Sequence, residues 1–313
     1  MASFEDQLIQ AMKRKREAEG LSIRALSAAI GISFSTLARI ERGEGQPDNN
    51  SKIRLLEWLG ADAEAAGLGF ENVALVHFRA AKNVQSTTVR TLLKAADCLR
   101  RTLGGHNAHR PADEVGDGAS EAVSLSKEEL EQTAERFRAD LGLAPDQPLD
   151  SLRIKVEGVT VVGASVSDSL EPSLKAALLG GLSGEWSAMS VPLDADHDEW
   201  AVLLNDSHTV ERQRVTVLEE FWHILLGHKL TKISRVAEAY GRTYDSAEEH
   251  DAYYCASATL LPRAAVAGAV AEKQTSAQIA ARFGTSPELV DYRIKRLGLW
   301  REHVGKQVQL APE

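Results

Sequence analysis

The chain has 313 residues, which is long enough for two domains with separate hydrophobic cores. Its hydrophobic content of 43% and charged content of 26% exclude long disorder as the main state. It has no run of about 18 apolar residues and no apolar secretory core near its start, so we expect a cytoplasmic protein that does not enter a membrane.

The net charge and the two cysteines indicate which partners and which cysteine chemistry the chain can have. The formal net charge of −9 argues against nucleic-acid binding over the whole surface, but a local basic face remains compatible with it. The stretch from Arg79 to Arg110 is basic, and it suits DNA phosphates, a dimer interface or a solvated helix face. Cys98 and Cys255 lie far apart in apolar helical segments, so we expect buried thiols, not a disulfide or a metal cluster.

The first hundred residues have apolar positions at helical spacing, in short segments that end at glycines. This pattern predicts an all-helical unit over residues 1–103. Residues 104–124 are rich in Gly, Ala, Asp and Ser without an apolar period, which is typical of a flexible linker.

Residues 125–313 mix helical and strand patterns. "SKEELEQTAERFRADLG" predicts a helix whose Ser126 and Glu129 have the spacing of a capping box. "LRIKVEGVTVVGASV" alternates like a strand pair around Gly158, and "EWAVLLND" is rich in β-forming residues. Helical patterns return in "ERQRVTVLEEFWHILLGH" and "SAEEHDAYYCASATLLP". We therefore predict an α+β unit in which a small sheet packs against helices.

The segment "LSIRALSAAIGISFSTLARIERGEGQP" predicts two helices joined by a turn at residues 31–33. Its apolar residues can form one core beneath both helices, namely Leu21, Leu26, Ile30, Ile32, Leu37 and Ile40. The second helix then turns a small, polar and basic face outward, where a helix in a major groove reads bases, and flanking arginines suit phosphate contacts. The predicted DNA-binding residues are Arg24, Ser33, Phe34, Ser35, Thr36, Arg39 and Arg42.

With its "IERG…P" ending, this segment resembles the Xre, or Cro/C1-type, helix-turn-helix family of repressors over residues 5–62. The resemblance implies binding to double-stranded DNA as a homodimer on two half-sites. The family often has a glutamine where this chain has Ile23 and Arg24, so the base preference is not predicted. The alternative is a helical interaction domain with the same core pattern, although the outer face is not apolar.

The segment "LEEFWHILLGH", residues 218–228, looks like the zinc helix of a metallopeptidase with its first histidine replaced. In an H-E-x-x-H helix, both histidines bind zinc from one face, and the glutamate activates the bound water as general base. Here Glu219 stands at the first ligand position and His223 at the second. Glu220 stands at the general-base position and is the candidate catalytic residue.

The neighbouring segments support this alignment. "AVLLNDSHTVERQRVTVLEEFWHILLGH" resembles the approach to the active helix in the ImmA/IrrE-like metallopeptidase family. "RTYDSAEEHDAYYCASATLLPR" resembles that family's second acidic helix, which ends in an LLxP-like turn at Pro262. Matching backwards from Pro262 implies Glu249 as the third, carboxylate ligand, with Asp251 and Glu248 as near alternatives. The resemblance covers about residues 125–300.

The fold class predicted for the chain is therefore a mainly α N-terminal helix-turn-helix domain plus an α+β, zincin-like C-terminal domain over residues 125–313. Because a carboxylate is an accepted zinc ligand, Glu219, His223 and Glu249 form the candidate metal set. Two anionic ligands would raise the pKa of the bound water and favour harder cations. Zinc is the candidate cofactor, and manganese or no metal, with a polar hydrogen-bonded cluster instead, are the alternatives.

Two further features leave alternatives open. His228 supplies another ligand if the chain turns after Gly227, or it caps the end of the helix. The tail "TSAQIAARFGTSPELVDYRIKRLGLW" has a second helix-turn-helix pattern with Ser286 as an N-cap. Its outward residues Tyr292, Arg293 and Arg296 would read DNA, or else the helical pair packs on the peptidase core, as at the end of the ImmA/IrrE-like fold.

Two functions of different classes follow from these patterns. The first is a DNA-binding transcription regulator whose peptidase-like domain senses a signal or cleaves a partner protein. The second is an active zinc metalloprotease that cleaves a repressor, with the N-terminal module serving recruitment. A toxin or antitoxin partner is a third interpretation, but the C-terminal unit is larger than that role usually needs.

Overall fold

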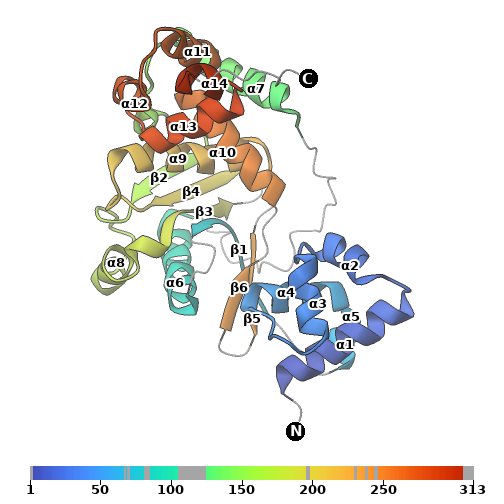
Figure 1. Ribbon diagram of the computed structural model, residues 1–313. Helices are drawn as coiled ribbons and strands as arrows, with labels where there is room; N and C mark the ends of the chain where they lie inside the picture. Colours follow the sequence, from blue (N-terminus) through green and yellow to red (C-terminus); the bar gives the residue numbers. More distant parts are fainter. Residues whose placement is uncertain are drawn as a thin grey trace, which may run out of the picture.

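The N-terminal module consists of helices packed around one core, at the end of the molecule that carries the N-terminus (Figure 1). The computed structural model describes residues 3–66, 68, 71–80, 85–104, 125–194, 198–228, 231–236, 239–242 and 246–305. The helices of this module are α1 (Phe4–Ala18), α2 (Ile23–Ile30), α3 (Phe34–Glu41), α4 (Asn49–Leu59) and α5 (Ala61–Ala65). The predicted core is confirmed for Leu26, Ile30, Ile32, Leu37 and Ile40, which are buried, whereas Leu21 is half-exposed.

Caps and one glycine fix the turn between α2 and α3. The side chains of Ser22 and Ser33 accept hydrogen bonds from backbone N–H groups in the first turns of α2 and α3. Between the helices, Gly31 has a φ of +65°, a left-handed conformation that favours glycine. Arg54 of α4 donates from Nη1 to the carbonyl oxygen of Gly31 at 2.5 Å. The turn is therefore held by α4 as well as by its own caps.

A six-stranded sheet crosses the middle of the molecule in the order β2-β4-β3-β1-β5-β6. The neighbours β2 and β4 run parallel, and the other neighbouring pairs run antiparallel. The strands are β1 (Glu71–Ala80), β2 (Val159–Gly163), β3 (Trp186–Asp194), β4 (Glu199–Leu204), β5 (Thr231–Val236) and β6 (Ala239–Arg242).

Strand β1 and helix α6 (Ser86–Leu103) change the domain division that the sequence predicts. β1 lies between β3 and β5 in the sheet, and the buried face of α6 packs against β3. The all-helical unit predicted over residues 1–103 therefore differs from the structure, because residues 71–80 belong to the sheet and residues 86–103 to its covering layer. The predicted linker, residues 104–124, lies outside the described residues apart from Gly104.

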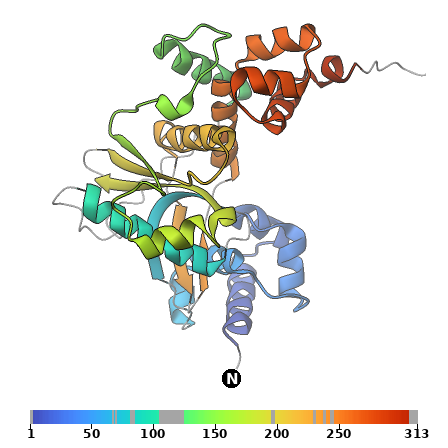
Figure 2. The ribbon, with the colours of Figure 1, turned by 90° about the vertical axis from the view of Figure 1, so that its left-hand side faces the viewer.

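Helices cover both faces of the sheet (Figures 1 and 2). Helices α6 and α8 (Pro172–Leu179) lie on one face, and α9 (Val210–Leu225) lies on the other with α10 (Ser246–Leu260) beside it. Because side chains alternate along a strand, Met189 and Val191 of β3 join the core under α6, whereas Ser190 meets α9. The alternation of β3 thus brings a hydroxyl group to the helix that carries the altered motif.

The remaining helices pack against α9 and α10 in a separate core. They are α7 (Lys127–Asp140), α11 (Arg263–Ala271), α12 (Ser276–Phe283), α13 (Pro287–Arg296) and α14 (Trp300–Val304). The short 3-10 turn η2 (Ser151–Arg153) contacts α9, and the turn η3 (Ser183–Glu185) contacts α8 and β3. The predicted capping box of Ser126 and Glu129 begins α7, and Ser286 caps α13 as predicted.

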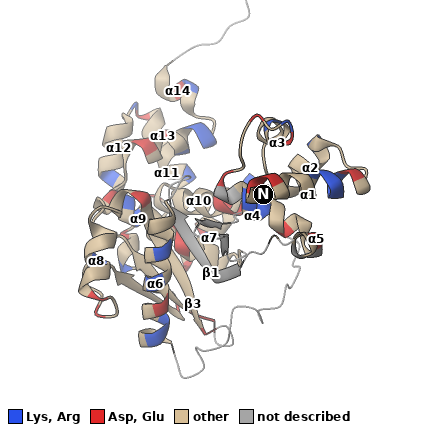
Figure 3. Ribbon diagram, turned by 90° about the horizontal axis from the view of Figure 1, so that it is seen from below, with Lys and Arg blue, Asp and Glu red and all other residues tan. Residues whose placement is uncertain are grey.

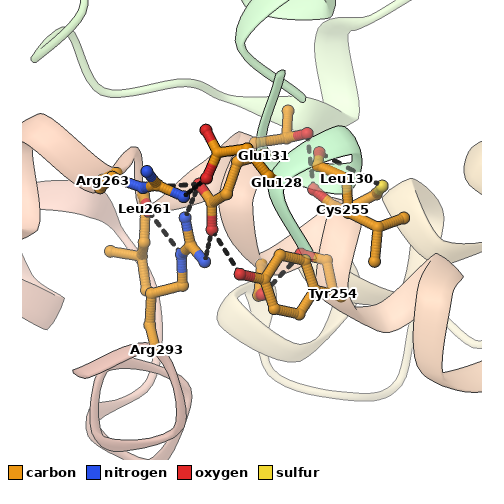
Figure 4. A network of polar contacts seen from close by, with 10 residues as sticks. Glu128, Leu130, Glu131, Tyr254, Cys255, Leu261, Arg263 and Arg293 are labelled. Carbon is orange, nitrogen blue, oxygen red and sulfur yellow. Dashed lines mark hydrogen bonds and ion pairs between the residues drawn. The ribbon is translucent and has the colours of Figure 1, made fainter. Parts of the chain in front are cut away.

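A buried ion pair ties the tail to this core (Figure 4). Arg293 of α13 is fully buried and donates from Nη1 and Nη2 to the two carboxylate oxygens of Glu131 in α7, at 2.5 and 2.6 Å. The hydroxyl of Tyr254 in α10 donates to the same carboxylate at 2.6 Å. The predicted outward orientation of Arg293 is therefore wrong. The exposed residues Glu288 and Asp291 give the outer face of α13 acidic groups that suit DNA poorly.

Burial and charge set the protonation of this network. Burial by itself would raise the pKa of the Glu131 carboxyl, but hydrogen bonds and charge from Arg293 outweigh it and hold that pKa below its usual value. Burial and the neighbouring Glu131 raise the pKa of Tyr254 to about 12. Burial also raises the pKa of the Cys255 thiol to about 12, so this predicted buried cysteine stays protonated near neutral pH. Cys98 is half-exposed, unlike the prediction.

Two other observations complete the fold. The predicted strand pair around Gly158 is a single strand, β2, because residues 151–153 before it form a 3-10 turn. Among the described helices, no single one has the length and apolar character to cross a membrane. One pair, Ala247–Leu260 with Arg263–Ala271, meets both criteria only when combined, and it is bent by 60°.

Candidate DNA-binding and peptidase-like sites

The outer face of the α2–α3 pair carries the side chains predicted to contact DNA. Leu37 and Ile40 of α3 point into the core, so the opposite side of this short helix faces solvent. All the predicted DNA-contacting residues lie on the exposed surface: Arg24, Ser33, Phe34, Ser35, Thr36, Arg39 and Arg42. Their exposure leaves them accessible to a DNA duplex, as a helix in a major groove requires.

Phe34 is an unusual residue to leave exposed on this face. Its side chain is 47% exposed at the first turn of α3, and the guanidinium of Arg24 from α2 lies over its ring at 5.4 Å from the centroid. An apolar ring at this position suits contact with a thymine methyl group, while the stacked guanidinium suits a phosphate. The predicted base contact and the predicted phosphate contact would therefore lie side by side on this face.

Arg42 at the end of α3 already has a carboxylate partner. Its Nε and Nη2 donate to the two carboxylate oxygens of Glu44 at 2.9 and 2.8 Å. The hydrogen bonds from Arg42 hold the pKa of the exposed Glu44 carboxyl below its usual value. The module carries both acidic and basic residues on its helices (Figure 3). A phosphate that binds Arg42 must therefore compete with Glu44.

Replacing Glu44 with glutamine is expected to strengthen DNA binding by roughly threefold or more, because it removes a negative charge from the side chain that would meet a phosphate. The dissociation constant would be measured by fluorescence anisotropy on a labelled duplex at several salt concentrations. Glu19→Gln, at the C-terminal cap of α1, is the matched control, since Glu19 is also exposed and also paired, with Lys15 at 3.8 Å. Equal effects of the two variants would contradict a direct role of Arg42.

The altered motif lies in the buried part of α9. The N-cap Thr209 begins this helix, and its last turns pack between the sheet and α10. Glu219, Glu220 and His223 are 6%, 1% and 7% exposed. Carboxylates and imidazoles are rarely this buried without partners. The partners of these groups therefore decide what chemistry the site can perform.

Ser190 and Glu220 form the first contact of the candidate site. The Ser190 hydroxyl on β3 donates to Oε2 of Glu220, the residue at the general-base position. Sequence reasoning missed Ser190, although the alternation of "WSAMSVPLD" places it on the opposite side of the strand from Met189. The Glu220 carboxylate accepts this hydrogen bond and therefore has a structural partner in the sheet, in addition to any role with water.

His223 faces two further residues of the candidate site. Its Nδ1 lies 3.0 Å from Nδ1 of His228, so one imidazole donates this hydrogen bond and the other accepts it. Gly227, with a φ of +64°, ends the helix and turns the chain so that His228 reaches back. On its other side, Nε2 of His223 lies 3.8 Å from Oε1 of Glu249, near the start of α10. This distance fits an ion pair but is too long for a hydrogen bond.

The predicted metal set is only partly assembled. His223 and Glu249 are brought together, but among the described residues no group of three or more His, Cys, Asp or Glu side chains lies close enough to hold a metal ion. Catalytic zinc sites use three protein ligands at about 2.0–2.3 Å. The donor set at His223 therefore does not fit such an ion. Of the alternative third ligands, Asp251 lies 3.3 Å from Nδ1 of His250 and is half-buried.

The approach to α9 is held by buried polar contacts. Asn205, directly after β4, is fully buried and donates to the carbonyl oxygens of Ser183 and Trp186 at 3.0 and 3.1 Å. Arg212 in the first turn of α9 donates to the Ser187 hydroxyl at 2.8 Å. These contacts fix the start of the helix on the sheet, so the position of the altered motif is set by the fold itself.

The fold and these two sites define a class of protein, a helix-turn-helix module joined to a metallopeptidase-like domain. Comparison with family models agrees with both halves. Residues 12–57 match the helix-turn-helix family, and residues 187–295 match the IrrE N-terminal-like domain of the peptidase M78 family. The chain is therefore a helix-turn-helix domain fused to an ImmA/IrrE-like domain. No solved structure matches the chain.

Proposed function

We propose that the chain is a DNA-binding transcription regulator whose peptidase-like domain responds to a signal at the end of α9 instead of hydrolysing peptides. The regulator binds double-stranded DNA in the cytoplasm as a homodimer, one module on each half-site. The exposed face of α3, with its buried apolar side beneath, is the single observation that carries the DNA-binding part.

The altered motif supports sensing over cleavage for two reasons. A general base must be able to take a proton from a water molecule, and Glu220 is 1% exposed and accepts a hydrogen bond from Ser190. A zinc-dependent hydrolase also needs three ligands around one ion, and the described residues do not supply them in this arrangement. The pair of imidazoles, His223 and His228, with the carboxylate of Glu249 nearby, suits a ligand or a conformational signal.

A metalloprotease remains the second candidate, and one observation favours it. His223 and Glu249 come from two different helices and approach within 3.8 Å, as two ligands of one ion would. In that case Glu219 would supply the third bond, Glu220 would act as general base, and a partner protein would be the substrate. Zinc, or manganese as a harder cation, would be the metal. Hydrolysis of a repressor by the purified protein, abolished in Glu220→Gln, would favour this candidate.

Replacing Arg39 with alanine is expected to weaken binding to a duplex selected from a random library by the full-length protein. Arg39 is exposed on the outer face of α3, and loss of a base or phosphate contact there should cost about 1–3 kcal/mol, or roughly five- to one-hundred-fold in affinity. Electrophoretic mobility shift and anisotropy would measure the dissociation constant.

The matched control replaces a basic residue of the second helix-turn-helix pattern. Lys295 is exposed on α13, so Lys295→Ala removes one positive charge from the tail without touching the core. Its affinity should stay near that of the original protein. Loss of binding in Lys295→Ala, with Arg39→Ala unaffected, would move DNA recognition to the tail and refute the proposed assignment.

A further inference from the structure

The strands β1, β5 and β6, here called the strand extension, lie between the DNA-binding module and the rest of the molecule (Figures 1 and 2). The module meets this extension in two ways. The chain passes from α5, which ends at Ala65, into β1, and helix α4 packs against β6 and β5. The DNA-binding module is thus attached to the extension both along the chain and through packing.

The candidate site meets the same extension at three points. Ser190, the partner of Glu220, pairs with His77 of β1 in the sheet register. His228, the partner of His223, lies shortly before β5 begins at Thr231. Glu249 lies in the first turn of α10, which follows β6. Each element that carries a residue of the candidate site therefore adjoins a strand of the extension.

Helix α4 connects the extension to the recognition helix. Between residues 51 and 59, none of the α4 side chains is exposed. Helix α4 contacts α1 in addition to the strands β5 and β6 of the extension. It therefore has little room to move independently of these neighbours. From α4, Arg54 donates to the carbonyl oxygens of Ile30 and Gly31 at 3.4 and 2.5 Å, in the turn that joins α2 to α3. A displacement of β5 and β6 must therefore reach the turn that aims α3.

We propose that the strand extension couples the arrangement of His223, His228 and Glu249 to the presentation of α3, through α4 and Arg54. The proposal rests on the DNA-binding function above and specifies how the peptidase-like domain regulates it. A ladder of paired strands resists local slippage, because a one-residue shift turns every side chain to the opposite face. The extension therefore moves with the chain ends that leave α9 and enter α10, and it carries that movement to α4.

The first test measures DNA affinity in the full-length protein. His228→Ala removes the contact that fixes the chain after α9, and it should change the dissociation constant for the selected duplex at least threefold. His208→Ala is the matched control, because His208 is a half-buried histidine at the opposite end of α9, hydrogen-bonded to the Ser183 carbonyl at 3.0 Å. It should leave the affinity unchanged. Equal affinities of His228→Ala and the original protein would overturn the coupling.

A double-mutant cycle tests the route. Distant sites without a shared pathway are additive to within about 0.3–0.5 kcal/mol, which is roughly a factor of two in affinity. When His228→Ala and Arg54→Met are combined, the fold-change in the dissociation constant should differ from the product of the two single fold-changes by more than that factor. Circular dichroism of Arg54→Met would verify that the helices persist. Multiplicative fold-changes would exclude Arg54 from the route.

Hydrogen exchange tests the same coupling without any substitution, because coupling between two sites is reciprocal. Adding the selected duplex should change amide exchange in β5, in β6 and at the start of α10, in addition to direct protection of α3. The tail helices α12 and α13 should remain unchanged. Protection confined to the α2–α3 pair would overturn the proposal, whereas a protein that binds no duplex at all would instead overturn the proposed DNA-binding function.

Discussion

Arg293→Ala is expected to lower the free energy of unfolding of the C-terminal domain by about 3–5 kcal/mol. The substitution leaves the Glu131 carboxylate buried with its main counter-charge removed, and an uncompensated buried charge is among the most destabilising changes in a protein. Differential scanning calorimetry would measure the effect as a lower transition temperature. The transition of the helix-turn-helix module should change little, because the network lies wholly among α7, α10, α11 and α13.

Two further variants separate charge burial from the loss of a long side chain. Arg296→Ala removes an arginine from the same helix, but that side chain is half-exposed over the Tyr292 ring, so its effect should stay within about 0.5 kcal/mol. The double variant Glu131→Leu with Arg293→Met replaces both charges by apolar groups and should recover much of the loss. A double variant as unstable as Arg293→Ala would argue that the ion pair itself holds the tail in place.

Glu219→His is expected to raise the affinity of the protein for zinc by at least tenfold. The substitution restores a histidine four residues before His223, and two such histidines on one helical face reach the same ion. The original protein should hold less than one zinc per chain after dialysis, because its described residues lack a three-ligand group. Competition with a chromophoric chelator would measure the affinity, and elemental analysis would measure the content.

The control for this variant places a histidine at the other end of the same helix. Glu211→His, in the first turn of α9, changes the same residue type to histidine but lies away from His223. Its zinc affinity should match that of the original protein. Stoichiometric zinc in the original protein, lost in His223→Ala, would contradict the sensing role and favour the metalloprotease candidate.

Local patterns predicted the parts of both sites that lie within single helices. The serine cap and apolar spacing located α3, and every residue predicted on its outer face is exposed. The spacing of "LEEFWHILLGH" likewise located α9. The hydroxyl partner of Glu220 was not predictable, because Ser190 comes from another element of the chain. The proximity of His223 to Glu249 was expected only from a family resemblance, and among the described residues no third side chain completes a metal-binding group.

The sheet was predicted least well, again because its partners lie far apart in the sequence. β1 pairs with β3 and β5, whose residues follow it by more than a hundred positions, and no local period reveals such pairing. The apolar spacing of α6 predicted a helix correctly, but it could not indicate whether that helix packs on other helices or on a sheet. Arg293 shows the same limit, since a basic residue on a short helix is usually exposed and only its distant partner explains its burial.

The pairing of Glu71 in β1 with Arg235 in β5 also has a consequence for how the protein folds during synthesis. The helix-turn-helix module has contacts between residues close in sequence, so it can fold soon after it leaves the ribosome. β1 emerges next but must wait for β3 and β5, and in the meantime an unpaired strand edge is prone to aggregation. Slow translation or low temperature should therefore affect the yield of soluble protein through this one strand.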